Sequence, residues 1–282
     1  MTARLLLGRP IAERIAAQSQ KRVEALRARS ITPKLAIVSV GSDPAANTYA
    51  QRLIRGGRVA GIGVVGIALG RDTNEQDLRN ALDDLAHDRS VNGVLLLTPL
   101  PGALDEAHVV DHIAAEKDVE GMNPFSMGLL ADGRPRFIPS TAEAIVEILR
   151  FYEVPLRGAH TVILGRSTVI GRPVAALLLE EDATVTITHS RTVGLDVLTR
   201  GAEIVVIGVG RAGLVTGSML KRGAVVIDAG INVTATGIVG DADAESVSAV
   251  ASALSPVPGG VGAVTTALLL RNTIAATEEQ LG

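Results

Sequence analysis

Short runs of valine, isoleucine and leucine alternate with longer segments of helical periodicity, and this alternation restricts what the chain can fold into. Such runs are typical of buried parallel strands, which need crossover helices between them. Strands are predicted over residues 34–40, 64–69, 93–97, 161–164, 184–188, 204–209 and 225–228. Helices are predicted over residues 45–60, 74–87, 104–114, 141–151 and 263–278, with further helices beginning near residues 173, 194 and 216. The pattern predicts an α/β protein built from two successive series of βαβ units.

Residues 115–140 interrupt this alternation. Glycine and proline recur through the segment, at 121, 124, 128, 133, 135 and 139. Residues of these two types end regular structure and favour turns. We therefore predict a connection that contains functional loops between the two series.

The composition excludes several functional classes. The chain has no cysteine, which rules out disulfides, cysteine nucleophiles and thiolate metal sites. A net charge of −3 argues against nucleic-acid binding by bulk charge. No uninterrupted apolar stretch is long enough to span a membrane, and the leucine run near the amino terminus is too short for a signal-peptide core. We expect a cytoplasmic protein without membrane or nucleic-acid partners, and the histidines lack the spacing of a metal site.

The strand predicted to end at Leu164 leads into a glycine-containing loop. Gly165, Arg166 and Ser167 follow the strand, and Gly171 precedes the expected helix. Backbone N–H groups at the start of a helix can hold a phosphate. The two glycines are six residues apart, so this is not the G-x-G-x-x-G fingerprint, and a simple strand-to-helix turn remains an alternative.

The loop after the next strand contains Ser190 and Arg191 and no carboxylate. NAD-preferring folds place an aspartate or glutamate there, whereas a 2′-phosphate needs cationic and hydroxyl groups. With Arg166 on the neighbouring loop, these residues favour NADP, although NAD remains possible and a solvated polar turn is the alternative. Gly208 and Gly210, after the third strand of this half, would let a cofactor approach the backbone.

Several motifs in order along the chain support a more specific assignment. They are residues 41–44 with Tyr49, Pro99-Leu100-Pro101, Lys117-Asp118-Val119 with Gly121, residues 165–173, residues 227–232, Gly240-Asp241, and the run Pro256-Val257-Pro258-Gly259-Gly260-Val261-Gly262. Over nearly the whole chain the sequence resembles the methylenetetrahydrofolate dehydrogenase/methenyltetrahydrofolate cyclohydrolase family.

The resemblance implies a two-domain α/β fold with a cleft between the domains. Residues 1–138 and the returning helix 263–282 would form the folate-binding domain, and residues 139–262 a Rossmann-like NAD(P)-binding domain. Family members transfer a hydride from 5,10-methylenetetrahydrofolate to the nicotinamide, and many also hydrolyse the methenyl product. They are usually homodimers, so a homodimer is expected here.

The resemblance, together with the loop analysis, also assigns site residues. The expected cofactor-binding residues are Gly165, Arg166, Ser167, Gly171, Ser190, Arg191, Gly208, Gly210 and Ile231. The expected folate-binding residues are Tyr49, Pro99, Leu100, Glu120, Pro258, Gly259 and Gly260. The catalytic positions are Tyr49, Leu53, Leu97 and Glu120, and no metal is expected.

Two of the catalytic positions depart from the family pattern. The family places a lysine four residues after the tyrosine and a glutamine before Pro-Leu-Pro, and here these are Leu53 and Leu97. Leucine cannot transfer a proton, so we expect the cyclohydrolase activity to be lost or weak. Replacing both polar partners together can be nearly neutral for stability. Glu120 keeps a carboxylate where the family has aspartate.

Three functions therefore remain open. The first is an NADP-dependent methylenetetrahydrofolate dehydrogenase without effective cyclohydrolase activity. The second is an oxidoreductase that acts on another small substrate, because the pocket is more apolar than that of the family. The third is a folate- or nucleotide-binding protein without catalytic activity.

Overall fold

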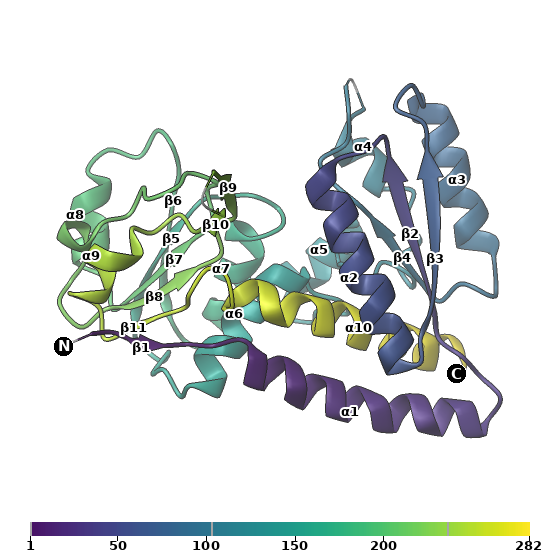
Figure 1. Ribbon diagram of the computed structural model, residues 1–282, viewed down its shortest axis with the longest axis horizontal. Coiled ribbons are helices and arrows are strands. Elements are labelled where there is room, and N and C mark those ends of the chain that lie inside the picture. Colours follow the sequence, from purple (N-terminus) through teal and green to yellow (C-terminus); the bar gives the residue numbers. More distant parts are fainter. Residues whose placement is uncertain (1, 103, 236) are drawn as a thin grey trace. The chain divides into compact units, whose positions relative to one another are not determined.

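The computed structural model describes residues 2–102, 104–235 and 237–282. They form two compact units (Figure 1). Unit 1 contains the residues up to Glu13 and Pro139–Thr265, and unit 2 contains Arg14–Ile138 and Thr266–Gly282. Within the described residues, no helix has the length and apolar character that crossing a membrane requires.

Unit 1 is built on a six-stranded parallel sheet with the order β1-β11-β8-β7-β5-β6. Its strands are β1 (Arg4–Leu5), β5 (His160–Leu164), β6 (Thr184–Thr188), β7 (Ile204–Ile207), β8 (Val225–Asp228) and β11 (Ala253–Leu254). Its further elements are α6 (Ser140–Phe151), α7 (Gly171–Glu180), α8 (Leu195–Arg200), η1 (Gly217–Met219), α9 (Ala244–Ser248) and the hairpin of β9 (Asn232–Thr234) and β10 (Gly237–Val239). The central strands β5 and β7 are largely buried, which explains the continuous apolar runs at 162–164 and 204–207.

Unit 2 contains a three-stranded parallel sheet with the order β3-β2-β4. The strands are β2 (Lys34–Val40), β3 (Gly63–Leu69) and β4 (Gly93–Leu96). The helices are α2 (Pro44–Ala60), α3 (Glu75–His87), α4 (Glu106–Val110) and α5 (Pro124–Ala131), together with most of α1 (Arg9–Ala28) and α10 (Val261–Gln280).

Alternate residues of the central strand β2 enter two separate hydrophobic cores. Leu35 and Ile37 pack in a cluster with residues of α1, α2 and α10, whereas Ala36 and Val38 pack in a cluster with residues of α3 and α4. Successive side chains of a strand point to opposite faces, so residues 35–38 of β2 are all apolar because helices cover both faces. Leu97, just after β4, belongs to the first of these clusters.

The seven predicted strands agree with the structure to within two residues at each end, but the short strands β1, β9, β10 and β11 and the long helix α1 were not predicted. Strands β2, β6 and β8 have the predicted bounds, and Asn74 caps α3 by accepting a hydrogen bond from the backbone N–H of Asp77 at 2.9 Å. The predicted helix over 104–114 is wrong in length, since α4 spans only Glu106–Val110. The helix expected near residue 216 is a single 3-10 turn, and α5 occupies part of the predicted connection.

The division of the chain also differs from the sequence-based ranges. Residues up to 13 and residues 263–265 belong to unit 1, although the ranges 1–138 and 263–282 assigned them to the other domain. The cause at the amino terminus is β1, which pairs in parallel with β11 through Arg4 and Ala253 and so joins the large sheet. A two-residue strand gives too short an apolar pattern to be recognised in the sequence.

Candidate functional site

The loop between β5 and α7 is shaped by three glycines in close contact. Gly165 has a φ of +111°, which favours glycine. A Cβ at Gly171 would lie 2.1 Å from the carbonyl oxygen of Gly165, and a Cβ at Gly165 would lie 2.7 Å from that of Gly208. Only glycine fits at these positions. The six-residue spacing thus encodes a tight strand-to-helix turn beside the end of β7.

The polar groups of this turn lie at its surface. Arg166 and Ser167 are exposed, and the Ser167 hydroxyl accepts a hydrogen bond from the backbone N–H of Ile170 at 3.1 Å. Helix α7 then begins at Gly171, so its first N–H groups follow the loop directly. A helix start beside an exposed arginine is a suitable environment for a phosphate.

The loop after β6 lies beside this turn because β5 and β6 pair in register up to Leu164 and Thr188. The backbone N–H of His189 donates to the Thr192 hydroxyl at 2.9 Å, and that of Arg191 donates to the imidazole Nδ1 of His189 at 3.2 Å. Ser190 and Arg191 remain exposed at the tip of this small turn.

The other predicted cofactor residues follow neighbouring strands at the same edge. Gly208 comes after β7 and donates its backbone N–H to the carbonyl oxygen of Leu164 at 3.1 Å. Gly210 is exposed with a φ of +66°, and Ile231, after β8, is 65% exposed. All these loops therefore gather at the carboxyl ends of the parallel strands, the edge at which open α/β sheets bind ligands.

The predicted folate-binding turn of unit 1 follows β11. A cis peptide bond precedes Pro258, and Gly259 has a φ of +107°. The backbone N–H of Gly8 donates to the carbonyl oxygen of Gly259 at 2.9 Å, and a Cβ at Gly8 would lie 2.1 Å from that of Gly260. The turn is thus held against the chain that leaves β1, with Pro258 and Gly259 exposed.

In unit 2, Tyr49, Leu53 and Leu97 lie in one cluster. Leu53 is 0% exposed and Leu97 is 6% exposed, and half-buried Tyr49 packs against the same group. The sequence prediction that positions 49, 53 and 97 come together agrees with this packing. The two leucines form part of the hydrophobic core beneath the tyrosine.

The segment after Leu97 is more open. Thr98 and Pro99 are exposed and joined by a cis peptide bond, and Leu100 is half-buried. The backbone N–H of Leu100 donates to the Glu106 carboxylate at 2.9 Å, which ties this turn to the start of α4.

Glu120 stands on a loop that buried polar groups hold in place. The Asp118 carboxylate accepts hydrogen bonds from the backbone N–H groups of Met122 at 3.0 Å and Asn123 at 2.8 Å and from the Ser126 hydroxyl at 2.7 Å. The Asn272 amide donates to the carbonyl oxygen of Val119 at 3.0 Å. Glu120 itself is half-buried.

The same loop begins with a buried lysine. The Lys117 ammonium donates to the carbonyl oxygens of Leu85 and Asp88, both at 2.8 Å, at the end of α3. Burial lowers the pKa of Lys117, and burial raises the pKa of Asp118 although its hydrogen bonds oppose this shift. The sequence prediction missed the supporting roles of Asp118 and Asn272. An aspartate followed four and five residues later by loop N–H groups is a local signal for the first, but nothing local indicates the second.

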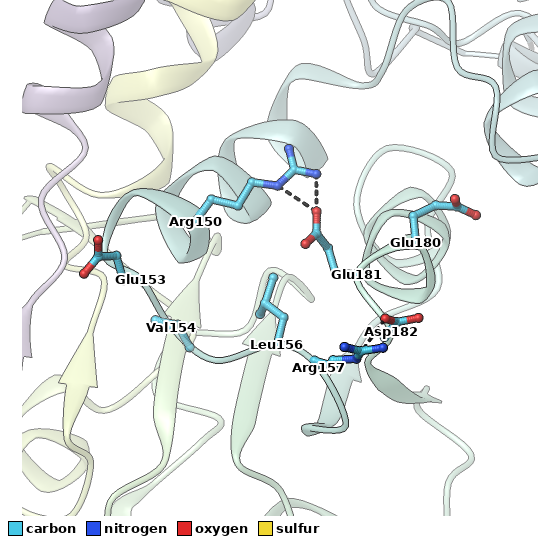
Figure 2. A pocket seen from close by; sticks show the side chains of 8 residues that line it. All are labelled: Arg150, Glu153, Val154, Leu156, Arg157, Glu180, Glu181 and Asp182. Atoms are coloured by element: carbon cyan, nitrogen blue, oxygen red, sulfur yellow. Dashed lines mark hydrogen bonds and ion pairs between the residues drawn. The ribbon is translucent and has the colours of Figure 1, made fainter.

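A hollow of unit 1 lies at the other edge of the sheet. Figure 2 shows its lining residues, Arg150, Glu153, Val154, Leu156, Arg157, Glu180, Glu181 and Asp182. They come from the ends of α6 and α7 and the segments that lead into β5 and β6. The Arg150 guanidinium donates to Glu181 at 2.8 Å, and Arg157 lies 3.3 Å from Asp182. The hollow lies at the edge opposite the predicted cofactor loops, and its charged side chains pair with one another. Both observations argue against a ligand site there. Among the residues described, no group of three metal-ligating side chains occurs.

Family models match both parts of the chain. Residues 6–120 match the catalytic domain of tetrahydrofolate dehydrogenase/cyclohydrolase, and residues 139–281 match the NAD(P)-binding domain of the same family. The chain belongs to the tetrahydrofolate dehydrogenase/cyclohydrolase family. The resemblance found in the sequence motifs is thereby confirmed, and so is the two-domain α/β fold class.

Individual relatives agree with this assignment. The chain is 46% identical over 281 residues to the bifunctional protein FolD of Arthrobacter globiformis, covering 99% of this chain and 96% of that protein. The crystal structure of the bifunctional FolD enzyme of Campylobacter jejuni is 35% identical with a TM-score of 0.95, over 98% of this chain and 99% of that one. The FolD structure of Trypanosoma brucei, complexed with NADP and an inhibitor, is 31% identical with a TM-score of 0.94, over 100% and 99%.

The raised pKa of Asp118 leads to a prediction about stability. In the folded protein its carboxyl group binds a proton more readily than in the unfolded chain, so its contribution to stability is largest at low pH. This contribution declines as the pH rises from about 4, the usual pKa of aspartate, through the raised folded value. We expect the free energy of unfolding of the wild type, relative to that of D118N, to fall over this range. Urea unfolding of both proteins at a series of pH values measures it, and a constant difference would contradict the assignment.

Proposed function

We propose that this protein oxidises 5,10-methylenetetrahydrofolate to 5,10-methenyltetrahydrofolate with NADP. The observation that carries the proposal is the set of loops at the carboxyl edge of the unit 1 sheet, in a chain whose family is defined by this chemistry. NADP supplies the hydride acceptor, so the protein must mainly bind and align the two reactants.

The charged and hydroxyl groups of unit 1 support NADP in preference to NAD. Arg166 and Arg191 are exposed on adjacent loops, and Ser190 lies beside Arg191. Two guanidinium groups and a hydroxyl suit a 2′-phosphate, and residues 188–192 contain no carboxylate that would repel it. The close packing of Gly165, Gly171 and Gly208 leaves backbone free to approach a dinucleotide.

Tyr49 and Glu120 are the residues that we assign to the folate. A half-buried tyrosine ring offers a flat apolar face for the planar part of a folate. The Glu120 carboxylate would accept hydrogen bonds from the amino and ring N–H groups of the pterin, and the fixed loop around Asp118 keeps it in place. In this proposal Pro99, Leu100 and the turn Pro258-Gly259-Gly260 also contact the folate.

The first test is a comparison of NADP and NAD with methylenetetrahydrofolate as the substrate. We expect reduction of NADP with a higher kcat/KM than that of NAD. R191A should raise the KM for NADP about tenfold or more, because it removes a charge-assisted contact, and should change the NAD reaction much less. The exposed Arg222, in the turn before β8, provides a matched control as R222A. Absence of NADP reduction with this folate would contradict the proposal and favour another substrate or a non-catalytic binding protein.

We propose further that the cyclohydrolase step is lost or very weak. Hydrolysis needs a group that moves a proton, and positions 53 and 97 hold leucines that are both buried in a hydrophobic cluster. A hydrocarbon side chain neither donates nor accepts a proton. The burial of both leucines supports a site in which a water molecule finds no hydrogen-bonding side chain at positions 53 and 97.

Purified protein should therefore hydrolyse methenyltetrahydrofolate no faster than buffer alone. The double variant L53K/L97Q is expected to gain measurable hydrolysis, because it supplies a proton-transfer group together with a polar partner. L53M/L97M is the control, since it changes the same positions and keeps them apolar. Rapid hydrolysis by the wild type would contradict the proposed loss, and this measurement does not depend on whether the double variant folds.

We also propose that the protein is a cytoplasmic homodimer, as the family resemblance implies. One chain has a mass of 29.2 kDa, so sedimentation analysis should give about twice this value. A mass equal to that of one chain at micromolar concentration would contradict the dimer.

A further inference from the structure

The buried carboxylate of Asp241 holds the loop that follows β7. Its Oδ2 atom accepts hydrogen bonds from the backbone N–H groups of Val209 at 2.7 Å and Gly210 at 2.9 Å, and its Oδ1 atom accepts one from Arg211 at 2.8 Å. Asp241 is 0% exposed. Three consecutive backbone N–H groups thus converge on one side chain from a distant part of the sequence.

The same carboxylate also binds the segment that follows β8. The side-chain amide of Asn232 donates to Oδ1 of Asp241 at 2.8 Å and to the carbonyl oxygen of Gly240 at 3.2 Å. Four donors therefore share the two oxygens of Asp241. They join the loop that contains Gly210 to the segment that contains Ile231, so Asp241 couples two of the segments assigned to the cofactor.

A second buried carboxylate fixes the chain on either side of Asp241. Asp228, at the end of β8, accepts hydrogen bonds from the backbone N–H groups of Gly230 at 2.9 Å, Asp241 at 3.1 Å and Ala242 at 2.8 Å. Burial raises the pKa of Asp228 although its backbone hydrogen bonds oppose this shift, and the nearby Asp241 carboxylate adds a smaller increase. Asp228 and Asp241 thus belong to one connected hydrogen-bond network, which we call the scaffold.

Two glycines make room for this scaffold. A Cβ at Gly230 would lie 2.2 Å from Cγ of Asp241, and a Cβ at Gly240 would lie 2.0 Å from an oxygen of Asp228. Neither glycine has a positive φ, so space and not backbone conformation requires them. The motifs Gly230-Ile231-Asn232 and Gly240-Asp241 therefore have one shared explanation, which is to accommodate and satisfy buried carboxylates.

We propose that Asp241 is a positioning residue for the dinucleotide. It orients the loop 208–211 and the segment 231–232 at the edge where the cofactor binds, without touching the cofactor itself. A buried carboxylate costs free energy unless it is fully hydrogen-bonded, and Asp241 obtains its partners from these two segments. Before NADP arrives, the loops are already held in their binding geometry. This inference rests on the proposed NADP-dependent function.

The variant D241N tests the role directly. Asparagine has nearly the same shape, but an NH₂ group replaces one oxygen and faces N–H donors, so at least two of the four donors lose their acceptor. We expect the Kd and KM for NADP to rise about tenfold or more, because these are hydrogen bonds to a charged group. The KM for methylenetetrahydrofolate should change less than threefold, and kcat at saturating NADP should fall less than the KM for NADP rises.

E203Q is the matched control for this variant. Glu203 also accepts a hydrogen bond from a backbone N–H, that of His160 at 2.9 Å, but it lies at the amino-terminal edge of the same sheet. Calorimetric titration of each protein with NADP gives Kd, and thermal unfolding without ligand gives stability. E203Q should bind NADP as the wild type does.

The outcomes separate positioning from stability alone. If D241N lowers the unfolding temperature but binds NADP with the Kd of the wild type, the positioning role is wrong. If D241N does not fold, N232A decides, because it removes one donor and keeps both carboxylates. A threefold or larger rise in its Kd for NADP supports the proposal, and an unchanged Kd overturns it. Failure of the wild type to bind NADP would refute the proposed function itself, and it is seen before any variant is compared.

Discussion

The contact between Gly165, Gly171 and Gly208 is the constraint on which the cofactor edge of unit 1 depends. It brings the ends of β5 and β7 and the start of α7 closer than any side chain would permit. Strand pairing then places the loop after β6 beside this point, through Leu164 and Thr188. The exposed Arg166 and Arg191 and the start of α7 therefore lie on one edge of the sheet, because the glycines let the backbone segments below them pack in direct contact.

Buried charged groups hold the loop around Glu120 in unit 2. This loop has a buried carboxylate at its centre and a buried lysine at its beginning, and both are satisfied mainly by backbone groups. Asp241 does the same for the loops of unit 1. In both units a loop without regular structure is held by a buried carboxylate that accepts hydrogen bonds from backbone N–H groups of the loop. Loops held in this way need little reorganisation when a ligand binds.

The sequence predicted the strands well and the supports of the site poorly. Continuous apolar runs identified the buried strands β2 and β8 to the residue, because strands covered on both faces carry apolar residues at successive positions. The predicted bounds of β6 were also correct, although this edge strand alternates threonine with apolar residues. Helix α1 was missed because its buried residues, among them Ile11, Ile15 and Val23, are widely spaced within a polar sequence. The residues assigned to the cofactor were predicted from their chemistry, and the structure places Arg166, Ser190 and Arg191 at the surface of adjacent loops. The partners of Asp241 and Val119 were not predicted, since they lie about 30 and 153 residues away and only folding brings them together.

The burial of Leu53 and Leu97 has an evolutionary consequence. A lysine alone at position 53 would place an amine in a mainly hydrocarbon cluster, and a glutamine alone at position 97 would place an amide there, each without the other as its partner. Either single replacement costs stability before any gain in chemistry exists, and only the two together form a mutual contact. A lineage that has acquired the leucine pair must therefore pass through a less stable single variant before it can regain the polar pair.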